Sequence, residues 1–105
     1  MPPQPKAVID VETRSECDLR KCGSWKYSLD PSTALLCLAF RLPHWPRTEF
    51  GLWHPPFSHL DIAEEDVFGN LSDLLDWVIA GGIVEAHNWF FERGIWANIL
   101  VPRYA

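Results

Sequence analysis

The chain has 105 residues and a formal net charge of −5 at pH 7. This length corresponds to a single domain, and an apolar share of 48% is ordinary for a globular protein. The acidic balance argues against a general nucleic-acid-binding surface, which needs clustered Lys and Arg to neutralise phosphates. It does not exclude a nuclease, because metal ions neutralise an acidic pocket before a phosphate enters it.

The cysteines and the start of the chain bear on its compartment. Cys17, Cys22 and Cys37 cannot all pair within one chain. No signal-peptide pattern is present at the N-terminus, and no apolar run reaches the roughly 18–20 residues of a membrane-spanning helix. We therefore expect a cytoplasmic protein with reduced thiols and no membrane partner.

The first third of the chain predicts one strand and an irregular stretch. Residues 1–5 are Pro-rich and are expected to be disordered. The apolar run within 6–12 predicts a strand that is buried on both faces. Residues 13–31 show no clear period, with room for one helical turn that Gly23 would end.

The rest of the chain alternates strands and helices. Apolar residues over 34–42 predict a second strand, and the alternation over 47–54 predicts its hairpin partner. Apolar spacing over 67–79 follows the helical period of 3.6. A short strand is expected at 83–86, and a last helix at 88–100 with Asn88 as its N-cap.

This order is strand, strand, strand, helix, strand, helix. A helix between the third and fourth strands implies a parallel crossover, whereas the first three strands can pair antiparallel through short connections. The sequence therefore predicts an α/β fold with a mixed sheet.

Three carboxylates could meet at one edge of this sheet. Asp10 and Glu12 are two residues apart on the first strand, so they share a face. Glu92 lies early in the last helix, four residues after Asn88 and on the same side of that helix. If the strand at 83–86 lies beside the first strand, the acids converge and could hold two Mg²⁺ ions for phosphodiester hydrolysis.

Each of these residues also has a purely structural interpretation. Asp10 and Glu12 could be solvated acids at a strand end, because charged residues are mostly exposed. Glu92 could simply interact with the helix dipole, and Asn88 could be only a cap. His87 is a candidate general base, but a lone His before a helix is more often structural. The six tryptophans favour a core or interface role over base stacking.

Two segments resemble motifs of a known enzyme family. Residues Ile9 to Thr13 (Ile-Asp-Val-Glu-Thr) are similar to the first motif of the DEDD proofreading exonucleases, and Ala86 to Glu92 (Ala-His-Asn-Trp-Phe-Phe-Glu) resemble the second. The stretch 13–33, with 36–39, resembles the N-terminal exonuclease portion of phage and prophage DNA polymerases related to bacterial DNA polymerase I. The resemblance covers nearly the whole chain. It implies a ribonuclease H-like fold, incomplete at the C-terminus, and removal of nucleotides from DNA 3′ ends.

The resemblance also implies roles for individual residues. Asp10 and Glu12 would be catalytic metal ligands, with Glu12 near the terminal 3′-hydroxyl. Glu92 would be the third ligand and stands where the family more often has Asp. Thr13 would contact the terminal nucleotide. The strand-binding cleft would be lined by Asn88 and Phe91, with His87 as a further substrate-binding candidate.

One family motif has no counterpart in these 105 residues. Family members carry a third motif, a Tyr or His followed by an Asp, which supplies the general base and a fourth carboxylate; Tyr104 is too near the second motif to replace it. We therefore expect residues 1–105 to be the front part of an exonuclease domain from a phage or prophage in a bacterial host, weak or inactive in isolation. Its cofactor would be Mg²⁺ or Mn²⁺. Its partners would be a single-stranded DNA 3′ end and the remainder of a polymerase or a second copy of itself.

Two other functions compete with this one. A non-catalytic interaction module would use a bare sheet face and the aromatic residues to contact another chain, because large exposed apolar patches mark interfaces. A metal-binding protein without a nucleic-acid role is the weaker alternative.

Overall fold

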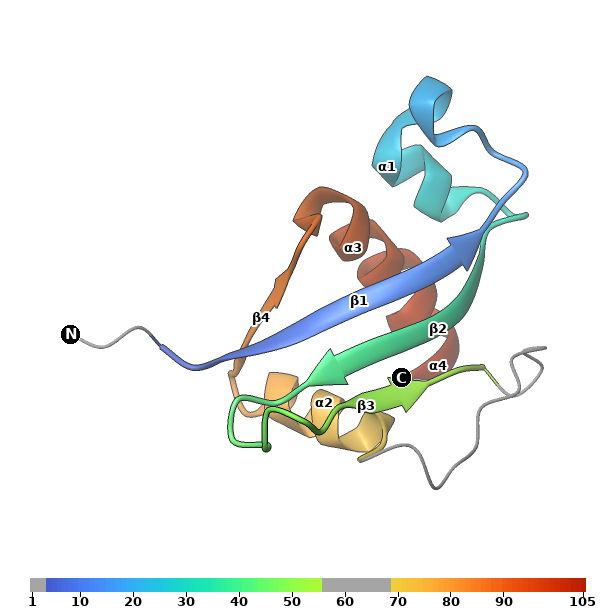
Figure 1. Ribbon diagram of the computed structural model, residues 1–105. Helices are drawn as coiled ribbons and strands as arrows, with labels where there is room; N and C mark the ends of the chain where they lie inside the picture. The colour runs from blue at the N-terminus through green and yellow to red at the C-terminus, as the bar shows by residue number, and fades with distance from the viewer. Residues whose placement is uncertain (1–3, 56–68) are drawn as a thin grey trace.

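Four strands form one mixed sheet in the order β3-β2-β1-β4 (Figure 1). The computed structural model describes residues 4–55 and 69–105. The antiparallel pairs are β1–β2 and β2–β3, and β4 runs parallel to β1. This confirms the predicted α/β class with a mixed sheet. The strands are β1 (Lys6–Arg14), β2 (Ala34–Arg41), β3 (Gly51–Trp53) and β4 (Ile83–Ala86).

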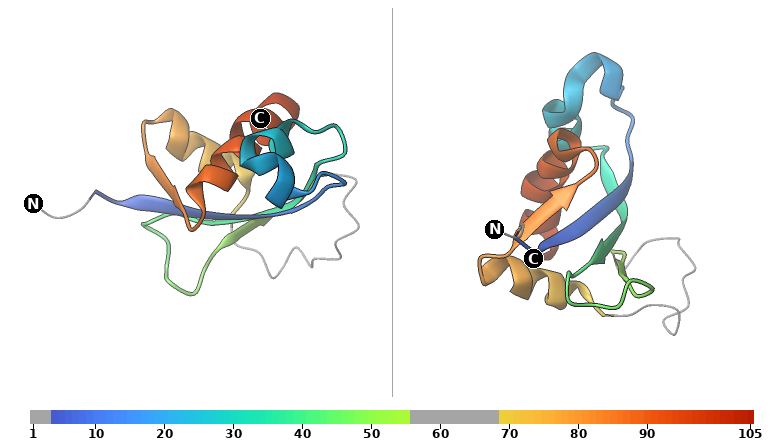
Figure 2. Two further views of the ribbon diagram at one scale, coloured as in Figure 1. Left: turned by 90° about the horizontal axis from the view of Figure 1, so that it is seen from above. Right: turned by 60° about the vertical axis from the view of Figure 1, so that its left-hand side comes forward.

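The helices lie against one face of the sheet (Figure 2). The other face carries no helix of the described residues. None of the described helices is long and apolar enough to cross a bilayer. The helices are α1 (Leu19–Leu29), α2 (Leu71–Ile79), α3 (Trp89–Ile95), the π-helical segment η2 (Trp96–Leu100) and α4 (Val101–Tyr104).

This one-sided arrangement corrects the prediction that β1 is buried on both faces. Ala7 and Ile9 are 0% and 2% exposed, whereas Val8 between them is 45% exposed. Side chains alternate across a strand, so Ala7 and Ile9 face the helices and Val8 faces the open side. The apolar run therefore reflects one buried face plus an exposed valine.

The helix α1 was missed by the sequence prediction beyond its first turn. Asp18 caps it by accepting a hydrogen bond from the Arg20 amide, and Gly23 interrupts it with φ of 79°. Helical geometry then resumes and buries Tyr27 and Ser28. With two buried residues at its end, α1 has too weak an apolar period to be recognised, and the element order becomes β-α-β-β-α-β-α.

The other differences concern element lengths. The strand expected over 47–54 is reduced to β3, where Gly51 lets the ring of Phe40 lie against the backbone. The helix expected from residue 67 has its first two residues outside the described part, and α2 begins after Asn70, whose side chain forms a capping box with Asp73. The C-terminal helical run continues past residue 100, with Pro102 near the start of α4.

The cysteines also differ from expectation. The structure joins Cys17 to Cys22 by a disulfide, so the prediction of reduced thiols is wrong for these two. Cys37 on β2 is free. The paired residues are Cys17 in the loop before α1 and Cys22 in the segment just ahead of Gly23.

The core lies between the sheet and the helix layer. Its fully buried members come from strands and helices alike: Ile9, Leu38, Leu74, Ile95 and Ile99. Four of the six tryptophans, Trp45, Trp53, Trp77 and Trp96, pack against this core. Trp25 and Trp89 are instead 47% and 46% exposed.

Candidate functional site

Asp10 and Glu12 lie on the open face of β1. Both side chains are exposed, and they alternate with Ile9 and Val11, which face the helices. Asp10 and Glu12 therefore share one face of the strand, as predicted from a strand's period of two. The Val8 side chain extends this face toward the start of the strand.

Glu92 approaches the same strand from the helix layer. The pairing of β4 with β1 ends at the partners Ala86 and Ile9. The chain then turns into α3, whose first residues lie close to β1 (Figure 1). A hydrogen bond from the Val11 backbone reaches the carboxylate of Glu92. Glu92 thus occupies the edge of β1 just past its pairing with β4.

Glu92 is an acid in an unfavourable environment. It is 4% exposed. Burial and the nearby charges of Asp10 and Glu12 together raise the pKa of Glu92 to about 7, against the opposing effect of the Val11 hydrogen bond. Since both β1 acids act on Glu92, the structure brings all three predicted carboxylates into one neighbourhood. Strongly shifted acids of this kind concentrate at functional sites.

One oxygen of Glu92 has no partner. Oε2 is buried and makes no hydrogen bond within the described residues. A buried carboxylate oxygen without a donor is expensive, and a cation is one way to satisfy it. The oxygen donors of the three acids are of the type that Mg²⁺ and Mn²⁺ prefer. In residues 4–55 and 69–105, however, no three His, Cys, Asp or Glu side chains are close enough together to form a ready-made metal site.

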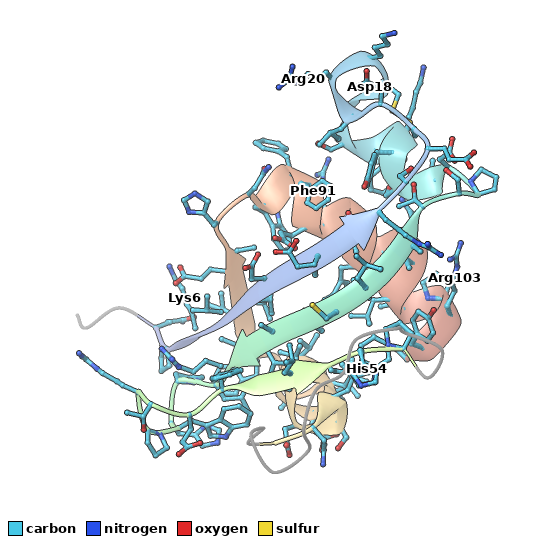
Figure 3. The ribbon with its side chains drawn as sticks, turned by 45° about the vertical axis from the view of Figure 1, so that its right-hand side comes forward. Lys6, Asp18, Arg20, His54, Phe91 and Arg103 are labelled. Carbon is cyan, nitrogen blue, oxygen red and sulfur yellow. A yellow bond between two sulfur atoms is a disulfide. The ribbon has the colours of Figure 1, made fainter. Side chains whose placement is uncertain are left out.

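The predicted substrate-binding residues fall into two groups. Thr13 and Phe91 are tied to α1: the Thr13 hydroxyl is 2.9 Å from that of Tyr27, and the rings of Tyr27 and Phe91 are 5.6 Å apart. Figure 3 shows Phe91 near the start of α3. Asn88 and His87 are exposed in the turn before α3, and Asn88 occupies the N-cap position without a side-chain capping bond.

Two hollows adjoin the acids. The first, of about 240 Å³, is shallow and has a largely apolar lining that includes Val8, Ala39 and Phe50, together with Asp10 and Arg41. The second, of about 330 Å³, is lined by Val8, Glu85, Ala86 and His87. His87 is therefore placed beside Val8 of β1, and an apolar recess lies next to Asp10.

Cys37 belongs to this neighbourhood and was not among the predicted residues. It is the cross-strand partner of Glu12. Burial raises the pKa of the Cys37 thiol, and the charges of Glu12 and Asp10 raise it further. Only the β1–β2 register brings Cys37 here, so no spacing in the sequence could have shown it.

Comparisons with protein families, characterised proteins and solved structures find no match for this chain.

Proposed function

We propose that this chain forms part of a divalent-metal-dependent 3′–5′ DNA exonuclease domain with a ribonuclease H-like fold. The observation that carries the proposal is Glu92: a buried carboxylate with an unpartnered oxygen, beside Asp10 and Glu12. A buried acid with no other role would destabilise the fold, because burial and the like charges of Asp10 and Glu12 oppose its ionisation. A site for cations gives these three acids a common role.

The residues would divide the work by their positions. Asp10 and Glu12 would offer oxygens from the open face of β1, and Glu92 would offer its free Oε2 from the helix side. When bound, divalent cations lower the pKa of an attacking water and stabilise charge on the phosphate oxygens. The apolar recess next to Asp10 has a lining suited to a nucleobase.

Metal binding by the full chain tests this proposal. Thermal unfolding is followed while Mn²⁺ is added to the wild type, to Asp10→Asn and to Asp76→Asn, an exposed acid on α2. At a free concentration of ten times Kd, binding should stabilise the wild type by about 1.4 kcal/mol, which corresponds to a rise in Tm of roughly 6–11 °C. Asp76→Asn should respond like the wild type and Asp10→Asn much less. Equal rises in all three proteins would remove the metal site.

An interaction module is the second candidate, because the open sheet face exposes apolar side chains. Val8 and Phe50 are 45% and 41% exposed there. Sedimentation of the wild type and of Val8→Asp over a range of concentrations tests self-association. A dimer that Val8→Asp dissociates would support this function, whereas a monomer at every concentration would count against a second copy as partner.

A further inference from the structure

A cluster of cations and exposed aromatic rings lies on α1 and α3, outside the carboxylate site. The guanidinium carbon of Arg93 is 5.7 Å from the ring centre of Trp25 and 5.8 Å from that of Phe90. These two rings are 47% and 73% exposed. Trp89, the residue before Phe90 on α3, has a side chain that is 46% exposed. The two helices pack against each other, so the cluster forms one surface, which we call the α1–α3 surface.

The charge of α1 is opposite to that of the whole chain. Arg20, Lys21 and Lys26 lie on α1, which has no acid within its bounds. Together with Arg93 they make up four of the nine Lys and Arg residues in a chain of net charge −5. Asp18 and Asp30 flank α1 at its ends, and each carboxylate accepts local hydrogen bonds. Figure 3 shows Arg20 at the end of α1 that points away from the sheet.

Arg93 is held by aromatic rings and not by an acid. No carboxylate of the described residues lies within ion-pair distance of it. The fork of N–H donors is therefore free for an anion, and a guanidinium matches phosphate geometry well. Rings that flank it present flat faces on which bases can stack. A protein partner with an acidic patch would use the cations but would not require the exposed faces of Trp25 and Phe90.

We propose that the α1–α3 surface binds single-stranded DNA, with Arg93 contacting a phosphate and Phe90 and Trp25 stacking on neighbouring bases. This deepens the proposed exonuclease function and rests on it for the identity of the strand: Glu92 and Arg93 lie on the same helix, so the surface is close to one of the three acids. The binding itself needs neither metal nor hydrolysis.

Binding is measured by fluorescence anisotropy in EDTA with two labelled oligomers of about 12 units, an oligothymidylate and an abasic backbone of the same length. The wild type should bind the oligothymidylate more tightly, because each stacked base adds to the phosphate contacts. Phe90→Ala should weaken that binding by about five-fold or more and reduce the difference between the two oligomers. Ile79→Ala, which removes an 83% exposed side chain from α2, is the matched control and should change nothing.

The charge is tested separately. Arg93→Gln should weaken binding of both oligomers and lower the slope of log K against log salt by about 0.7. Arg103→Gln on α4 makes the same charge change elsewhere. Equal effects of the two Arg variants, or equal binding of both oligomers by the wild type, would overturn the proposal, as would equally tight binding to anionic lipid vesicles. These binding assays contain no metal. A negative result would therefore refute DNA binding by the α1–α3 surface without bearing on the Mn²⁺ response.

Discussion

At the scale of single residues, Glu92 is the most informative side chain. Its carboxylate is buried, lies beside two other acids and keeps one oxygen without a donor. Ionisation of Glu92 therefore lowers the stability of the folded state. One measurable consequence follows for the protein without metal.

Glu92→Gln should stabilise the metal-free protein more as the pH rises. The folded-state pKa is raised from 4.5 to about 7, so the folded state holds its proton longer than the unfolded chain does. The wild type therefore loses stability between about pH 4.5 and pH 7, and the loss is complete above that range. From about pH 5 to pH 8, the variant should gain up to about 3 kcal/mol relative to the wild type.

Urea unfolding in EDTA at these pH values measures the difference. Glu16→Gln is the control, since that residue is exposed and lies beyond the end of β1. A difference between Glu92→Gln and the wild type that stays constant with pH would contradict the raised pKa.

The reactivity of the Cys37 thiol depends on the charges of Asp10 and Glu12. Burial and the nearby Glu12 raise its pKa, so it should react slowly with a thiol reagent at about pH 8. Glu12→Gln removes one of these causes and should speed the reaction, while Glu16→Gln should leave the rate unchanged. Because Cys17 and Cys22 are paired, the reaction reads Cys37 alone in the folded protein. An unchanged rate in Glu12→Gln would show that the Glu12 charge does not act on the thiol.

At the scale of elements, the Tyr27 side chain joins α1 to both the strand and the helix that carry the acids. The Tyr27 hydroxyl contacts Thr13 of β1, and its ring contacts Phe91 of α3. The end of α1 is thereby held against the strand and the helix that carry the three acids. The position of the α1–α3 surface relative to Glu92 depends on the same contacts.

Tyr27→Phe should lower the free energy of unfolding by about 1 kcal/mol, because it deletes one hydrogen bond and keeps the ring. Thr13→Val removes the other partner, and a double-mutant cycle in urea isolates their coupling. Tyr104→Phe is a matched control on α4. Additive effects of the Tyr27 and Thr13 substitutions would mean that the hydrogen bond does not contribute.

At the scale of the whole molecule, the proposed site rests on three acids, Asp10, Glu12 and Glu92. The resemblance implies a third motif with a general base and a fourth carboxylate, and these 105 residues contain no such motif after the second one. His87 is exposed in the turn before α3 and lines a hollow with Val8. In the described part of the fold, the candidate cation site is therefore formed by acids, and no hydrogen bond orients the His87 ring toward it.

The 105-residue chain should therefore degrade single-stranded DNA slowly even with Mn²⁺. General-base catalysis is typically worth about 10²–10⁴-fold, so a loss of that size is expected relative to a complete site. A 5′-labelled oligonucleotide and a denaturing gel show shortening from the 3′ end. Rapid shortening that disappears in Glu12→Gln would contradict this prediction, and its loss in His87→Ala would then identify the missing base.

The sequence by itself determined the strands that carry the site and the face shared by Asp10 and Glu12. Both follow from local rules: an apolar run of strand length, and a side-chain period of two. It left open whether the strand at 83–86 lies beside the first strand, and the parallel pairing of β1 and β4 supplies that condition. It missed most of α1, because few of that helix's residues are buried and its apolar period is correspondingly weak.

Only the tertiary structure decided the chemistry of the individual groups. The burial of Glu92 depends on β4 ending at Ala86, so that the edge of β1 is open where α3 begins. The place of Cys37 depends on strand register, and the exposure of Val8 depends on the helices covering one face of the sheet. Arg93 meets Trp25 because α1 packs on α3. These are contacts between residues far apart in the chain, and no local pattern specifies them, because burial and electrostatic environment are properties of the packed molecule.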